Sequence, residues 1–81
     1  MVPMNEKKFE IRAYYKSELA MIYFPQMSRR NAVRRLNGWL RINRNLSYLL
    51  EINDFTPSQV QQIVDECGEP YEYLEAKSDH F

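Results

Sequence analysis

Helix start and stop signals divide this chain of 81 residues into short segments, and they limit its fold more than any other sequence feature. The segment Thr56-Pro57-Ser58-Gln59 is a capping box with proline at the first helical position, so it predicts where a helix begins. Gly68 is the expected C-terminal cap, and Pro70 prevents the helix from continuing. The expected buried face of this helix is Val60, Ile63, Val64 and Cys67.

Two further helices are expected before it. The segment KSELAMIYFP predicts the first, with Ser17 as its N-cap, and Pro25 ends it because the residue before a proline is pushed out of the helical region. Ser28 is the expected N-cap of a longer helix over residues 29–43. The apolar stripe of that helix consists of Ala32, Val33, Leu36, Trp39 and Leu40.

The remaining apolar positions predict smaller elements. Residues 9–15 alternate with period two, which is typical of a short strand or an extended arm, and Phe55 is the candidate partner strand. Residues 46–52 fit a short third helix. We therefore predict a mainly α fold of three to four short helices, with a helix-turn-helix-like pair and an optional two-stranded β element. The expected core is Leu19, Ile22, Tyr23, Phe24, Val33, Leu36, Leu40, Leu49, Val60, Ile63 and Val64.

The length of the chain allows one domain with one small core. We expect a disordered lead-in over residues 1–8, a single compact helical domain over residues 9–70 and an acidic tail over residues 71–81. No apolar run approaches the roughly 18 residues of a membrane span, and the N-terminus lacks the apolar region of a signal peptide. These features predict a cytoplasmic protein without membrane contact.

The net charge of zero conceals a strong asymmetry. Residues 1–45 carry ten Lys and Arg against three acids, whereas residues 46–81 carry one Lys against eight acids. Six arginines and no acid lie between Ser28 and Asn45. This distribution indicates a polyanionic partner, or pairing between the two halves of the chain.

Helical geometry places Arg30, Arg34 and Arg41 opposite the apolar stripe of the second helix. Two features of this helix are unfavourable for its own stability. Arg29 and Arg30 stand in the first turn, where the partial positive charge of the helix end disfavours cations, and Gly38 costs about 1 kcal/mol relative to alanine. Residues that disfavour their own helix and that core packing does not require tend to mark functional sites.

The segments SELA and SRRNAVRRLNG resemble the helix-turn-helix pattern of repressors, in which a serine caps the recognition helix. The spacing differs, because Ala20 and Ser28 are eight residues apart, about two more than in that pattern, and Pro25-Gln26-Met27 replaces the usual glycine. We therefore expect a small protein that binds duplex DNA through its arginine-rich second helix. Asn31 is the side chain most able to read an adenine edge, and the arginines would mainly hold phosphates. The candidate nucleic-acid-binding residues are Arg29, Arg30, Asn31, Arg34, Arg35, Arg41 and Arg44.

The alternative is a protein-interaction or self-association module that acts through charge complementarity. Its partner would be an acidic protein surface or a second copy of the chain in a homo-oligomer. The chain also carries its own carboxylates, which could neutralise the arginines: Asp65, Glu66, Glu69, Glu72, Glu75 and Asp79. Arginines that face solvent favour nucleic acid, whereas arginines paired with these acids favour the alternative.

Little in the sequence indicates catalysis or metal binding. His80 is the only histidine, and the only glycines, Gly38 and Gly68, form no phosphate-cradling loop. Cys67 has no neighbouring cation to lower its pKa, so we expect it to be inert. We predict no enzyme activity, no catalytic residue, no metal site and no cofactor. Five aromatic rings could stack on bases, but their helical or strand spacing favours packing in the core, and Tyr14 is expected to be the most exposed of them: Tyr14, Tyr15, Tyr23, Phe24 and Trp39.

Three segments, KSELAMIYFP, SRRNAVRRLNGWL and FTPSQV…GEP, together resemble the domain-of-unknown-function family 4248, a family of small bacterial proteins. The resemblance covers Phe9 to Pro70. It implies a compact intracellular bacterial domain, and it assigns no functional residue because the activity of the family is not established.

Overall fold

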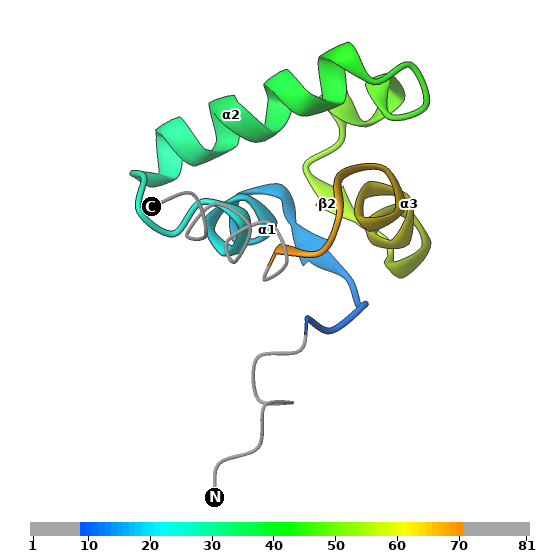
Figure 1. The fold of residues 1–81 in the computed structure, drawn as a ribbon, viewed down its shortest axis with the longest axis horizontal. Coiled ribbons are helices and arrows are strands. Elements are labelled where there is room, and N and C mark those ends of the chain that lie inside the picture. The colour runs from blue at the N-terminus through cyan, green and yellow to red at the C-terminus, as the bar shows by residue number, and fades with distance from the viewer. Residues whose placement is uncertain (1–8, 71–81) are drawn as a thin grey trace, which may run out of the picture.

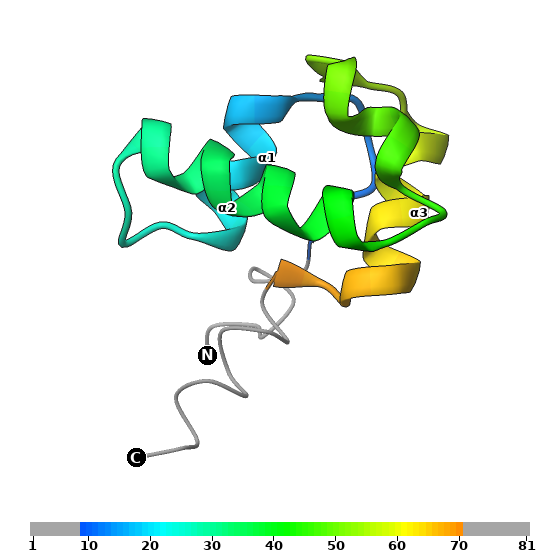
Figure 2. The same ribbon diagram turned by 90° about the horizontal axis from the view of Figure 1, so that it is seen from above.

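Residues 9–70 are the part of the chain that the computed structural model describes, and they fold mainly into helices. In chain order the elements are β1 (Tyr14–Tyr15), α1 (Lys16–Tyr23), α2 (Arg29–Ile42), the 3-10 helix η2 (Ser47–Glu51), β2 (Asp54–Phe55) and α3 (Pro57–Cys67). α1 and α3 lie on the same side of α2 (Figure 1), and α1 runs at a steep angle to α2 (Figure 2). The predicted mainly α class with a small two-stranded element is confirmed. The predicted lead-in and acidic tail lie outside the described residues.

The predicted start of α2 and both predicted ends of α3 are confirmed by their caps, whereas α2 ends at Ile42, one residue before its predicted end. The Ser28 hydroxyl accepts a hydrogen bond from the Asn31 N–H at 3.2 Å, which satisfies a free donor of the first turn of α2. At the start of α3, the Gln59 N–H donates to the Thr56 hydroxyl at 3.3 Å, and the Thr56 N–H donates to the Gln59 side chain at 2.9 Å. Gly68 ends α3 with a φ of 87°, a conformation that favours glycine.

The predicted N-cap of α1 is wrong. The helix begins at Lys16, so Ser17 lies inside its first turn, and Tyr15 is the cap residue. The Glu18 carboxylate accepts a hydrogen bond from the Tyr15 N–H at 2.9 Å, and its negative charge in the first turn stabilises the start of the helix. Contacts with a distant loop fix this start, because the Lys16 N–H donates to the Asn53 carbonyl at 2.6 Å.

The two strands pair antiparallel, with Tyr14 opposite Phe55 and Tyr15 opposite Asp54. Pairing is therefore confirmed, but only the last two residues of the predicted strand 9–15 are in it. The period-two pattern predicts that Phe9, Ile11, Ala13 and Tyr15 share one face, and this is wrong. Ile11, Ala13 and Tyr15 are exposed, whereas Phe9 and Tyr14 are buried and stack with their ring centres 5.4 Å apart. The expectation that Tyr14 is exposed is also wrong: its hydroxyl donates to the Glu10 carbonyl, and Tyr15 is the exposed ring.

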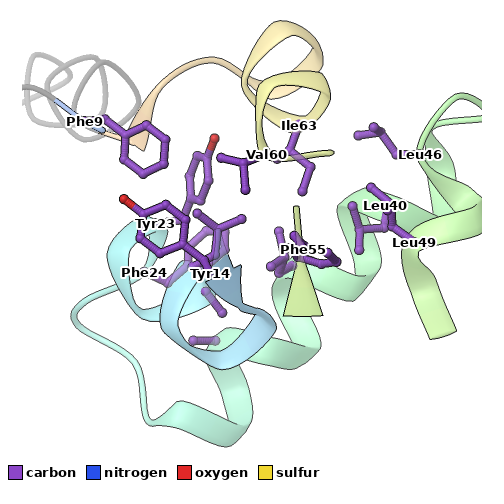
Figure 3. Packing of buried hydrophobic residues seen from close by; sticks show 14 residues of the cluster. Phe9, Tyr14, Tyr23, Phe24, Leu40, Leu46, Leu49, Phe55, Val60 and Ile63 are labelled. Carbon is purple, nitrogen blue, oxygen red and sulfur yellow. The ribbon is translucent and has the colours of Figure 1, made fainter. Parts of the chain in front are cut away.

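The core lies between α2 and the layer formed by α1, β2 and α3. Val60 and Ile63 point from α3 toward Phe55 (Figure 3). Most of the predicted core is buried, whereas Ile22, Val33 and Val64 are partly buried and pack against it. The structure adds buried residues that the sequence did not single out as core: Phe9, Tyr14, Ala20, Ala32, Leu46 and Phe55.

The helices are short. α2 is the longest at 14 residues, and the predicted third helix over residues 46–52 forms as the five-residue 3-10 helix η2. Within residues 9–70, no helix combines the length and the hydrophobicity that crossing a membrane requires.

Candidate nucleic-acid interface

The outer face of α2 carries a row of three arginines. Arg30, Arg34 and Arg41 are spaced four and seven residues apart, so they share one side of the helix, and all three are exposed. We call these three residues the basic stripe. Leu36 and Leu40 are fully buried on the opposite side, which fixes the rotation of α2 and keeps the basic stripe on the outside.

A second row runs beside the basic stripe. Asn31 and Arg35 are exposed and four residues apart, so they lie one turn from each other. The guanidinium carbon of Arg35 lies 5.8 Å from the centre of the Phe24 ring, a cation–π arrangement. Arg35 as a whole is exposed despite this contact.

The structure places the two remaining candidate residues away from both rows. Arg29 precedes Leu36 by seven residues, so it lies on the same side of α2 as Leu36, and it is exposed in the first turn of the helix. Arg44 follows the end of α2 and is exposed in the turn that leads to η2, where its carbonyl accepts a hydrogen bond from the Ser47 hydroxyl at 3.3 Å. The candidates therefore form a central cluster with one arginine at each end.

Carboxylates in the described part of the chain do not neutralise the arginines of α2. The single ion pair within residues 9–70 joins Arg12 to Glu10 at 3.9 Å, both at the surface. The Glu66 carboxylate instead accepts hydrogen bonds from the side chains of Asn43 at 2.9 Å and Asn45 at 3.2 Å, and these bonds lower its pKa. Of the other acids that we considered as partners, Asp65 accepts a hydrogen bond from the Gln61 side chain at 2.8 Å, whereas Glu72, Glu75 and Asp79 lie outside the described residues.

A shallow groove runs along the second row. Its lining consists of Met27, Asn31, Arg34, Arg35, Gly38, Trp39 and Ile42. Ile42 is 80% exposed at one end. Sequence reasoning missed the groove, because it assigned Trp39 to the core and did not single out Met27 or Ile42. The helical spacing of positions 31, 35, 38 and 42 was the signal that could have found it.

Trp39 is half-buried rather than buried, and aromatic neighbours hold its ring in place. Its ring centre lies 5.3 Å from that of Tyr23, with the two planes at 83°, and 4.9 Å from that of Phe24, with the planes at 64°. Edge-to-face contacts of this kind are favourable beyond the area that they bury. The Tyr23 hydroxyl also donates to the Gly68 carbonyl at 2.5 Å, which ties the cluster to the end of α3.

Lys16 is buried, which its charge did not predict. Its ammonium group donates to the Leu50 carbonyl at 2.8 Å, and burial lowers the pKa of Lys16 below its ordinary value of 10.5. The contact joins α1 to η2, so the role of Lys16 is structural. Within residues 9–70, no group of three or more His, Cys, Asp or Glu side chains could hold a metal ion.

Cys67 should react slowly with alkylating reagents. Burial raises the pKa of the Cys67 thiol from 9.0 to about 11, and the negative charge of Glu66 makes a smaller contribution in the same direction. Because only the thiolate reacts, we expect iodoacetamide at pH 8 to modify the folded protein about 100-fold more slowly than the unfolded chain. Mass spectrometry with and without urea measures the two rates. Equal rates would show that the thiol is not protected.

Comparison with known proteins identifies a family. The family model described as a domain of unknown function, DUF4248, matches residues 10–70. No curated protein and no solved structure matches the chain.

Proposed function

The chain belongs to the DUF4248 family, a domain of unknown function, and we propose that it binds duplex DNA through the exposed face of α2. In this proposal α1 and α2 act as a helix-turn-helix-like pair, with α2 as the helix that contacts DNA. The protein would act in the cytoplasm as a binding protein, without catalysing a reaction.

One observation carries the proposal: the basic stripe is exposed, and no carboxylate within residues 9–70 neutralises it. Exposed arginines on one side of a helix can contact several phosphates and release the counterions around them. Asn31 lies beside the stripe, where its amide could donate to and accept from an adenine edge. The arginines would therefore position the protein, and Asn31 would supply base preference.

The proposal predicts a strong salt dependence of binding. If four or five arginines contact phosphates, the logarithm of the binding constant should fall with the logarithm of salt concentration with a slope of about −4. Titration of a labelled random duplex at several salt concentrations measures this slope. Binding that is micromolar or weaker at low salt, and insensitive to salt, would contradict the proposal.

A second experiment separates DNA binding from self-association, the form of the alternative in which the partner is a second copy of the chain. Sedimentation of the protein without DNA reports its mass. A mass that rises with protein concentration and falls as salt is added would indicate self-association through charge. A constant monomer mass together with a steep salt slope for DNA supports the proposal.

A further inference from the structure

The groove along α2 carries two exposed cations. Arg34 and Arg35 both lie about one turn before Gly38, and helical geometry places them on either side of it. Neither guanidinium group belongs to an ion pair within residues 9–70. A negatively charged occupant of the groove can therefore pair with both arginines at once.

Gly38 leaves room between these two arginines. Its φ is not positive, so the backbone conformation does not require glycine. A Cβ atom added at Gly38 would meet nothing within 4 Å, so packing within the described part of the chain does not require glycine either. An occupant can therefore approach the backbone of α2 closely at this point.

The groove also has apolar side chains in its lining. Met27 is partly buried, and Ile42 is 80% exposed. Covering such side chains is favourable in proportion to the apolar area that is removed from water. The occupant that matches this groove therefore combines carboxylates with apolar side chains.

The acidic tail, residues 71–81, has this combination in its sequence, although it lies outside the described residues. Its three acids outnumber its one lysine. Glu72 and Glu75 stand on either side of Tyr73 and Leu74, so carboxylates and apolar side chains lie within four consecutive residues. The tail is therefore complementary to the groove in both charge and hydrophobicity.

The end of α3 lies next to the groove. Glu66 and Cys67 line a hollow together with Trp39 and Ile42, and these last two residues also line the groove. From Cys67 the chain turns back toward α1 (Figure 1), and Pro70 is at most about 11 Å from Cys67, because only three residues separate them. The tail therefore starts close to the Ile42 end of the groove.

The tail is also long enough to cover the groove. The groove extends from Asn31 to Ile42, a distance of about 16 Å along the axis of α2. Residues 71–81 can extend over about 36 Å. The length of the connection therefore does not prevent Glu72 and Glu75 from reaching the two arginines.

We propose that the acidic tail binds along this groove of the same molecule, with Glu72 and Glu75 paired to Arg34 and Arg35. Exposed ion pairs are individually weak. A segment of the same chain, however, is held at an effective concentration of the order of millimolar, so weak contacts are sufficient to keep it bound.

The bound tail competes with DNA for part of α2. This step rests on the proposed function, whereas the docking of the tail does not. Arg30 and Arg41 do not line the groove, so phosphates can contact them while the tail is bound. Further contacts of the DNA with Arg34 and Arg35 then require that the tail leaves. The tail therefore lowers the affinity for DNA without abolishing it.

Carbodiimide cross-linking of the full chain tests the docking without DNA. The reagent joins an amine to a carboxylate that is in contact with it, so the variant Arg34→Lys with Arg35→Lys introduces two reporters in the groove. We expect mass spectrometry of the digested monomer to find an amide bond between an introduced lysine and Glu72 or Glu75. The matched control, Arg41→Lys with Arg44→Lys, changes two exposed arginines outside the groove and should give no such bond.

The cross-links have outcomes that overturn the docking. Absence of a bond to the tail in the groove variant overturns it. Bonds of equal yield in the control variant overturn it as well, because the tail then has no defined position on α2. Bonds that appear only in a covalent dimer, with a yield that rises with protein concentration, overturn docking within one molecule in favour of a second copy.

A titration with a random duplex tests the competition. Glu72→Gln with Glu75→Gln should raise the affinity for DNA about 5-fold, because two weak ion pairs are lost. Glu51→Gln with Asp65→Asn removes the same charge from exposed positions of the described chain, so this control should raise the affinity less than 2-fold. Cross-links in the groove without any DNA binding overturn the proposed function and leave the docking in place. Equal gains in both variants overturn the competition.

Discussion

Leu36→Ala should lower the free energy of unfolding by about 3 kcal/mol and leave much of the protein unfolded at 25 °C. Leu36 is fully buried, and removal of its side chain costs both the transfer free energy of the lost groups and the cavity that remains. The core of so short a chain supplies a net stability of only about 3–5 kcal/mol, so a loss of about 3 kcal/mol removes most of that stability. Urea denaturation followed by circular dichroism measures the change.

Ile42→Ala is the matched control on the same helix. Ile42 is 80% exposed, so its replacement should change the free energy of unfolding by no more than about 0.5 kcal/mol. The difference between the two variants tests the rotation of α2, on which the exposure of the basic stripe depends. A larger effect at Ile42 than at Leu36 would mean that α2 packs by another face and that the arginines do not share the outer side.

Local chemistry explains which elements could be predicted from the sequence. The starts of α2 and α3 depend on side chains within three residues of the cap, namely Ser28, Thr56 and Gln59. The end of α3 depends on Gly68, whose positive φ is local as well. These caps depend only on residues that are close in the sequence, so contacts with the rest of the chain do not change them.

Long-range contacts explain the errors at the N-terminal side. The start of α1 depends on the pairing of Tyr15 with Asp54 and on the hydrogen bonds of Lys16 to Asn53 and Leu50, more than 30 residues away. A lysine in isolation predicts an exposed position, and only a carbonyl brought near by the fold makes burial acceptable. The burial of Tyr14 has the same origin, because it lies opposite Phe55.

The candidate site also has one part that local helical geometry predicts and one part that depends on tertiary packing. Helical geometry was sufficient to predict that Arg30, Arg34 and Arg41 share a side of α2. Helical spacing also places positions 31, 35, 38 and 42 on one side of α2, but it does not determine how Trp39 packs against Tyr23 and Phe24, and the shape of the groove depends on that packing. The open space at Gly38 also appears only once the surrounding elements are placed.

Replacement of the whole basic stripe by glutamine should reduce the affinity for a random duplex by a factor on the order of 10²–10³ at 0.1 M salt. Each arginine that contacts a phosphate contributes about −0.9 to the salt slope, so the loss of three should change the slope from about −4 to about −1. Arg30→Gln, Arg34→Gln and Arg41→Gln combined alter only exposed positions, and glutamine favours helices, so the fold should persist. Fluorescence anisotropy at several salt concentrations gives both the affinity and the slope.

The matched control replaces the same three arginines by lysine. Lysine keeps the charge and binds phosphate as a point charge, so the slope should stay near −4 even if the affinity falls somewhat. A slope that is steep in the lysine variant and shallow in the glutamine variant assigns the counterion release to this face of α2. If the glutamine variant instead keeps the original slope, the phosphates contact other cations, and the exposed face of α2 is not the DNA-binding surface.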